Sequence, residues 1–188
     1  MDNHDPQNIE NQREYSRVDA YIPLEYKLVA PPQRQHIRSR VAGETILSEF
    51  KSLPDPDDQL IAEWLKIINT KLNSIIRMLT IHQEGFDQLP MRRVNISGGG
   101  ISFSADTPYF PGNILEFKLT LTMQYPLSLF LYGEVVETSK HNPEYNTSAE
   151  FIVIDDFIRD EVIRFVFEKE REILREKRKW PFYNSCFL

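Results

Sequence analysis

Two short segments of this chain carry side chains suited to holding a phosphate or a nucleobase. In residues 94–103, apolar and polar residues alternate up to Ser97, three glycines follow, and the alternation then resumes. This pattern predicts a hairpin with a glycine turn. Asn95 and Ser97 are two residues apart, so they share one face of the strand, and we expect positive φ at Gly100. An amide, a hydroxyl and glycine N–H groups suit a phosphate or a base edge, although a glycine hairpin without a ligand has the same pattern.

The second segment contains Arg13 and Arg17, which are four residues apart and lie immediately before a predicted strand. Arginine pairs bidentately with phosphate or with the O6/N7 edge of guanine, and it stacks on base planes. The alternative interpretation is two solvated surface charges. Arg34 and Arg38 repeat the spacing without preceding a strand, and we interpret that copy as coincidence. Two further arginines lie beside the hairpin, on opposite faces of its first strand: Arg92 and Arg93.

A series of strands must position these segments. Alternating apolar residues predict a strand over 18–29, in which Pro23 suggests an edge position or a bulge. Sequential strands with short turns further along indicate an antiparallel sheet or barrel. The expected ranges are 91–96, 101–104, 114–122, 127–138 and 147–153.

Helical patterns precede and follow these strands. A short helix is predicted over 44–51, and a proline break with acidic cap candidates follows at 54–58. The next helix ends at Gly85 and has apolar residues at spacings of 4, 3, 4, 3 and 4, which form a heptad seam. Asp155 and Asp156 cap a final helix. The seam residues are Ile61, Leu65, Ile68, Leu72, Ile75 and Leu79.

The heptad seam predicts self-association. Leucine at the a positions with isoleucine at d shifts parallel coiled coils from dimers towards trimers or tetramers. Four further apolar residues widen the face: Trp64 and Met78 at g, and Ala62 and Ile76 at e. We predict a homo-tetramer, with a trimer as the alternative. The other interpretation is that this helix packs on its own barrel through a further apolar face, made of Leu60, Ile67 and Ile81.

Length and composition narrow the class of protein. A chain of 188 residues with a net charge of -6 is long enough for one domain, and its acidity argues against broad nucleic-acid binding. Cys186 is the only cysteine, so no internal disulfide forms and we expect a reducing, cytoplasmic location. Residues 1–12 are polar, show no secretory signal and are expected to be a flexible tail. No apolar run is long enough to span a membrane.

The pattern Arg13-x-x-x-Arg17 before the first strand, with Asn95-x-Ser97-x-x-Gly100 at a hairpin, resembles the PilZ domain family. This resemblance implies an α+β fold, namely a small antiparallel β-barrel that binds the bacterial second messenger cyclic di-GMP. In that family the arginine pair grips phosphates and guanine edges, and the hairpin contacts the other side of the ligand. The implied ligand-binding residues are therefore Arg13, Arg17, Asn95, Ser97 and Gly100.

The long helical segment between the two motifs is similar to an atypical, self-assembling PilZ subfamily in which inserted helices form an intermolecular bundle. Residues 53–56, 94–101 and 163–167 resemble that subfamily. The expected organisation is a tail at 1–12, a single domain at 13–179 and an aromatic tail at 180–188. Within the domain we expect a helical assembly insertion at 33–89, the main strands at 91–153 and a C-terminal helix at 156–179.

The sequence therefore predicts a cytoplasmic bacterial receptor or adaptor that binds cyclic di-GMP, oligomerises through its inserted helix and contacts a downstream protein partner. It contains neither the Gly-Gly-Asp/Glu-Glu-Phe nor the Glu-Ala-Leu signature of enzymes that make or degrade this messenger, and no P-loop. The four histidines fit no metal-ligand spacing. We expect no catalysis, no cofactor and no metal. The alternatives are a structural oligomeric adaptor that binds no nucleotide, and a nucleic-acid-binding module, which the acidic charge disfavours.

Overall fold

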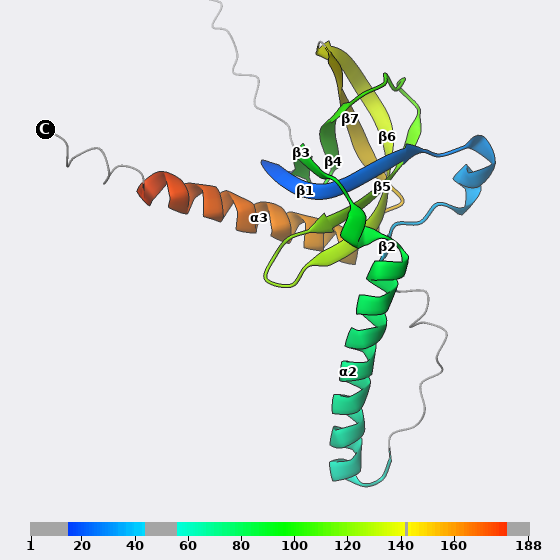
Figure 1. The fold of residues 1–188 in the computed structure, drawn as a ribbon, viewed down its shortest axis with the longest axis vertical. Coiled ribbons are helices and arrows are strands. Elements are labelled where there is room, and N and C mark those ends of the chain that lie inside the picture. Colours follow the sequence, from blue (N-terminus) through cyan, green and yellow to red (C-terminus); the bar gives the residue numbers. More distant parts are fainter. Residues whose placement is uncertain (1–14, 44–55, 142, 180–188) are drawn as a thin grey trace, which may run out of the picture.

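The computed structural model describes residues 15–43, 56–141 and 143–179 (Figure 1). Four predictions lie outside these residues: the tail at 1–12, Arg13, the short helix at 44–51 and the aromatic segment at 180–188. The elements in chain order are β1 (Arg17–Leu28), η1 (Pro31–His36), β2 (Arg40–Val41), α2 (Gln59–Gln83), η2 (Phe86–Gln88), β3 (Met91–Ser97), β4 (Gly100–Ala105), β5 (Ile114–Leu121), β6 (Leu127–His141), β7 (Glu144–Ile152) and α3 (Asp156–Lys179).

Six of the strands close into an antiparallel barrel. They follow one another in the order β6, β5, β1, β3, β4 and β7, and β7 then pairs with β6. The short strand β2 adds to the free side of β6. Closure pairs the two outermost barrel strands, β6 and β7, with each other, which reduces the edge that could pair with other chains. The predicted α+β fold built on an antiparallel barrel is confirmed.

The barrel interior is apolar because alternate residues of each strand face inward. Ile22, Ile96 and Phe117 are fully buried examples from three different strands. One side of α3 completes this core, and the carboxylate of Asp155 caps the helix by accepting the N–H of Ile158 at 2.9 Å. The core residues of α3 are Ile158, Val162, Phe165 and Val166.

The strand β1 changes partners halfway along its length. Up to Pro23 it pairs with β3, and from Leu24 onward it pairs with β5. Pro23 pairs with Met91 of β3, and the ladder with β5 begins only at Leu24, which agrees with the expectation of an edge position or a bulge. A proline has no N–H to donate, and the point where one ladder ends and the next begins tolerates that loss.

Two strand predictions need correction. The segment 33–89 was expected to be an insertion without strands, yet Arg40–Val41 pairs with β6. The β6–β7 hairpin is longer than expected, since its strands extend to His141 and begin again at Glu144. The outer end of this hairpin is exposed and polar on both faces, so it lacks the apolar alternation that identifies a strand.

The helix α2 projects away from the barrel, as Figure 1 shows in the lower half of the view. Asp58 caps its first turn by accepting the N–H of Leu60 at 2.8 Å, and Gly85 ends it with φ at 70°. The junction with the barrel is tied by Arg40, which donates to the Glu84 carboxylate at 3.1 Å. The other end of α2 therefore extends far from the core.

Candidate functional site

The two motif segments meet at one end of the barrel. Arg17 opens β1 directly opposite Ser97, the last residue of β3. Tyr15, which lies between the two arginines in the sequence, covers the glycine turn: a Cβ on Gly98 would be 2.9 Å from its ring, and a Cβ on Gly99 would be 3.2 Å from it. The pairing of β1 with β3 thus brings Arg17 to the hairpin predicted to share its ligand.

Ser97 is buried and stabilises the turn from within. Its Oγ accepts the N–H of Gly99 at 3.3 Å and donates to the carbonyl of Gly100 at 3.4 Å. The serine therefore fixes the conformation of the glycine turn through one N–H and one carbonyl of its backbone.

Gly100 does not have the positive φ expected from the sequence. Among the described glycines, those with positive φ are Gly43, Gly85 and Gly112. The reason for glycine at 100 is proximity to the neighbouring strand, because a Cβ there would lie 2.4 Å from the carbonyl oxygen of Ala149 in β7. The residue allows a close approach of two backbones rather than a left-handed turn.

Asn95 lies one row away from Ser97 and pairs with Asp19 of β1. Its Nδ2 donates to Asp19 Oδ1 at 2.9 Å, while Arg93 Nη2 reaches Asp19 Oδ2 at 3.5 Å. The hydrogen bond from Asn95 and, secondarily, the charge of Arg93 hold the pKa of Asp19 below its ordinary value. An ionised carboxylate thus lies on the outer face between the two arginines, Arg17 and Arg93.

The helix α3 contacts the glycine turn from the other side. Arg159 Nη1 donates to the carbonyl of Gly98 at 3.0 Å, and its guanidinium lies 5.7 Å from the centre of the Tyr15 ring. Ile163 contacts the same glycine, since a Cβ there would be 2.7 Å from its side chain. Ser16 also donates to Glu170 of α3. Any ligand that moves the turn or Tyr15 would therefore act on α3.

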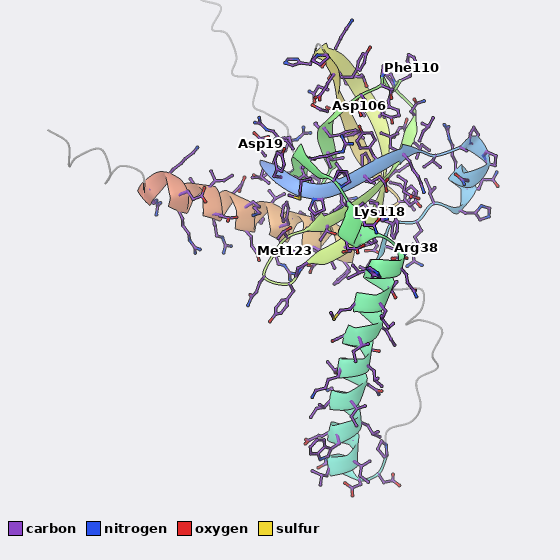
Figure 2. All side chains as sticks on the ribbon, in the orientation of Figure 1. Asp19, Arg38, Asp106, Phe110, Lys118 and Met123 are labelled. Carbon is purple, nitrogen blue, oxygen red and sulfur yellow. The ribbon has the colours of Figure 1, made fainter. Side chains whose placement is uncertain are left out.

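The remaining arginines lie elsewhere. Arg34 is in η1, beyond the far end of β1, and Figure 2 shows Arg38 and Asp19 on opposite sides of the barrel. The Arg34/Arg38 repeat is thus separated from the glycine turn. Arg92 faces away from this site, with its guanidinium 5.1 Å from the centre of the Tyr26 ring. Of the two arginines beside the hairpin, Arg93 is the one on the candidate face.

The predicted seam of α2 is exposed along its whole length. Its six side chains range from 45% exposed at Leu65 to 58% at Leu79, and Trp64 and Met78 at the flanks are 61% and 72% exposed. Of the three residues proposed to face the barrel, Leu60 and Ile67 are exposed as well, whereas Ile81 is half-buried. An apolar surface of this extent is typical of helices that contact another surface.

Three residues at the site were not identified from the sequence. Asp19 was detectable, because it is two residues from Arg17 and so shares its strand face. Tyr15 was hidden between the arginines, and Arg159 has no local signal, since only the packing of α3 brings it to the turn. Among the described residues, no group of three His, Cys, Asp or Glu side chains is arranged to hold a metal ion. None of the described helices is long and apolar enough to cross a membrane.

Known proteins resemble this chain in sequence and in fold. The family model for the PilZ domain matches residues 77–168, which include Asn95, Ser97 and Gly100 but not β1 or the arginine pair. The crystal structure of a pathogenic protein from Xanthomonas campestris, described as a new tetrameric PilZ domain self-assembled via an unusual helical bundle, has a TM-score of 0.54 to this fold. The two chains share 14% identity, over 86% of this chain and 91% of that one. No curated protein matches the chain. PilZ domains are regulatory binding domains, and residues 77–168, which build β3 to β7 and the first part of α3, match the model of this family.

Proposed function

We propose that this protein is a cytoplasmic receptor or adaptor for cyclic di-GMP in bacterial second-messenger signalling, without catalytic activity of its own. The observation that carries the proposal is the pairing of Arg17 with Ser97, together with Tyr15 over the glycine turn. Two segments some eighty residues apart in sequence contribute donors to one end of the barrel. The PilZ match supplies the ligand class, since this family binds that messenger.

The proposed ligand-binding residues are Arg13, Arg17, Asn95, Ser97 and Gly100. Arginine offers a planar fork of donors for phosphate or for the guanine O6/N7 edge. The Ser97 hydroxyl holds the glycine turn in place by accepting the N–H of Gly99, and a glycine turn allows phosphate oxygens to approach the backbone closely. The ligand therefore has charge-assisted donors from β1 and neutral donors from the hairpin.

The signal from this site would pass through α3 to a downstream protein partner. A ligand on the glycine turn changes the surroundings of Tyr15 and of the Gly98 carbonyl, and both contact Arg159. An anionic ligand beside Tyr15 would also compete for the Arg159 guanidinium. The ligand would therefore shift the position of α3, or change the exposure of the charged outer half of this helix.

We also propose that α2 assembles the protein into a homo-tetramer through Ile61, Leu65, Ile68, Leu72, Ile75 and Leu79. The exposure of the seam supports an intermolecular contact, and leucine at a with isoleucine at d favours more than two helices. This same surface favours a second candidate function, a structural oligomeric adaptor that binds no nucleotide.

Isothermal titration calorimetry with cyclic di-GMP separates the two candidate functions. The receptor predicts saturable binding by the parent protein, whereas the structural adaptor predicts none. Cyclic di-AMP serves as the control ligand, because it has the same phosphate ring but lacks the guanine edges. Equal binding of both dinucleotides would indicate an unspecific phosphate site and would contradict the proposal.

Light scattering of the parent and of Ile68→Asp/Leu72→Asp tests the assembly. Two buried, unpaired charges in the seam should dissociate the oligomer. The matched control is Thr70→Asp/Asn73→Asp, which places the same charges on the outer face of the helix and should leave the mass unchanged. A monomeric parent would exclude assembly, and a parent that stays oligomeric after the seam substitutions would move the interface elsewhere.

A further inference from the structure

Three cross-strand pairs follow one another on the outer face of β1 and β3. Alternation turns Val18 and Ala20 inward, where both are buried, and leaves the intervening side chains outside. At about 3.4 Å per residue, the four steps along β1 from the first pair to the third cover about 14 Å. Starting from the glycine turn, the pairs are Arg17 with Ser97, Asp19 with Asn95, and Tyr21 with Arg93.

We propose that Asp19 selects guanine by accepting hydrogen bonds from its N1–H and its exocyclic amino group. This inference rests on the proposed function, since it concerns how the same site tells one base from another. A carboxylate is an acceptor with two oxygens, and it matches two parallel N–H donors. Adenine has an unprotonated nitrogen where guanine has N1–H, so the same carboxylate would repel it.

The geometry leaves the Asp19 carboxylate oriented and available. Each oxygen has one partner, Asn95 at 2.9 Å for Oδ1 and Arg93 at 3.5 Å for Oδ2. A carboxylate oxygen accepts two hydrogen bonds, so each retains one acceptor position. The Asp19 side chain is 61% exposed, which leaves those positions open to a ligand. Asn95 therefore orients the carboxylate without occupying it.

The next pair offers a surface for the base plane. Tyr21 is 64% exposed and the Arg93 side chain 76% exposed, and they lie opposite each other on neighbouring strands. An aromatic ring and a guanidinium plane both stack on purines. Arg17 lies on the opposite side of Asp19, where it serves the phosphate. Positive charge, edge acceptor and stacking surface thus follow one another along β1.

Calorimetry on the full chain with cyclic di-GMP and with cyclic di-inosine monophosphate, which lacks only the two amino groups, tests Asp19. The parent should prefer the guanine ligand by about 10- to 150-fold, the range for a lost hydrogen bond to a charged group. Asp19→Asn keeps an oxygen for Asn95 but loses the carboxylate. It should bind cyclic di-GMP about 10- to 150-fold more weakly and lose the preference between the two ligands. Glu25→Gln, which removes an exposed carboxylate further along β1, should behave as the parent.

The possible outcomes separate this inference from the function on which it rests. If Asp19→Asn weakens binding but retains the guanine preference, Asp19 only positions Asn95 and the assignment is wrong. If the variant binds as the parent does, or the parent does not distinguish the two ligands, Asp19 does not read the base although cyclic di-GMP still binds. If the parent binds neither ligand, the proposed function itself fails and this assignment with it. Circular dichroism of each variant serves as the check that the fold is retained.

Discussion

Replacing Gly100 by alanine should destabilise the barrel through one backbone contact. The new Cβ would lie 2.4 Å from the carbonyl oxygen of Ala149, about 0.9 Å inside the roughly 3.3 Å of a close carbon–oxygen contact. The neighbouring atom belongs to the backbone of β7, so β4 and β7 must separate to relieve the overlap. Overpacking of this kind costs about 1–3 kcal/mol. The loss of unfolded-state entropy on Gly→Ala, about 0.4–1 kcal/mol, offsets only part of it.

The assay is thermal unfolding followed by circular dichroism, with Gly99→Ala as the matched control. After that offset the net loss is at most about 2.6 kcal/mol, and each kcal/mol corresponds to about 2–4 °C for a chain of this size, so Gly100→Ala should lower Tm by up to roughly 10 °C. A Cβ on Gly99 meets the Tyr15 ring at 3.2 Å, and a side chain can shift where a paired strand cannot. Gly99→Ala should therefore stay within about 1 kcal/mol of the parent, the range of surface substitutions and small rearrangements. Equal stability of Gly100→Ala and the parent would refute the close-approach explanation, and equal losses in the two variants would refute its assignment to β7.

Further predictions address the ligand, the assembly and the response to pH. In calorimetry, Arg17→Ala should weaken cyclic di-GMP binding by about 5- to 150-fold, as expected for a lost bidentate contact of roughly 1–3 kcal/mol. Arg34→Ala should bind as the parent does. If Arg34→Ala is instead the variant that binds weakly, the ligand is held by Arg34 and Arg38 and not by Arg13 and Arg17. Ile68→Asp/Leu72→Asp should reduce the mass measured by light scattering and leave the barrel signal in circular dichroism unchanged. If the barrel signal disappears together with the oligomer, the barrel needs the assembly in order to fold. Burial, with a hydrogen bond to a glutamate, raises the pKa of Tyr132 to about 12 from 10.0, so the unfolded chain loses this proton first as the pH rises. The stability of the parent should therefore fall relative to Tyr132→Phe between about pH 10 and 12 in urea titrations, and a constant difference across that range would exclude the linkage.

The apolar seam of α2 was predictable because its signal is local. Helical periodicity depends on spacings of three and four residues, and a cap depends on one side chain and the N–H groups next to it. The seam from Ile61 to Leu79, the cap at Asp58 and the left-handed Gly85 are all present. What covers the seam is not encoded locally, because a partner surface is not part of the helix's own sequence. The number of helices in the assembly therefore stays a prediction.

The candidate site was only half predictable, because a strand does not encode which strand will be its neighbour. Alternation along β3 placed Asn95 and Ser97 on one strand face, and Arg17 was expected immediately before β1, but the distance between the two segments in sequence gave no register. The tertiary structure alone determined that Arg17 is opposite Ser97 and that Asp19 is opposite Asn95.

The same distinction explains Gly100 and α3. A glycine in a turn motif suggests positive φ from local sequence, whereas the space it leaves for Ala149 exists only once β4 and β7 are paired. Arg159 reaches the glycine turn because the apolar side of α3 closes the barrel next to β1 and β3. The sequence by itself determined most of the strands, the two long helices and the residue types at the site, but not β2 or the outer end of the β6–β7 hairpin. Only the closed barrel decided which of those residues face one another, because strand register and helix docking depend on contacts between segments far apart in the chain.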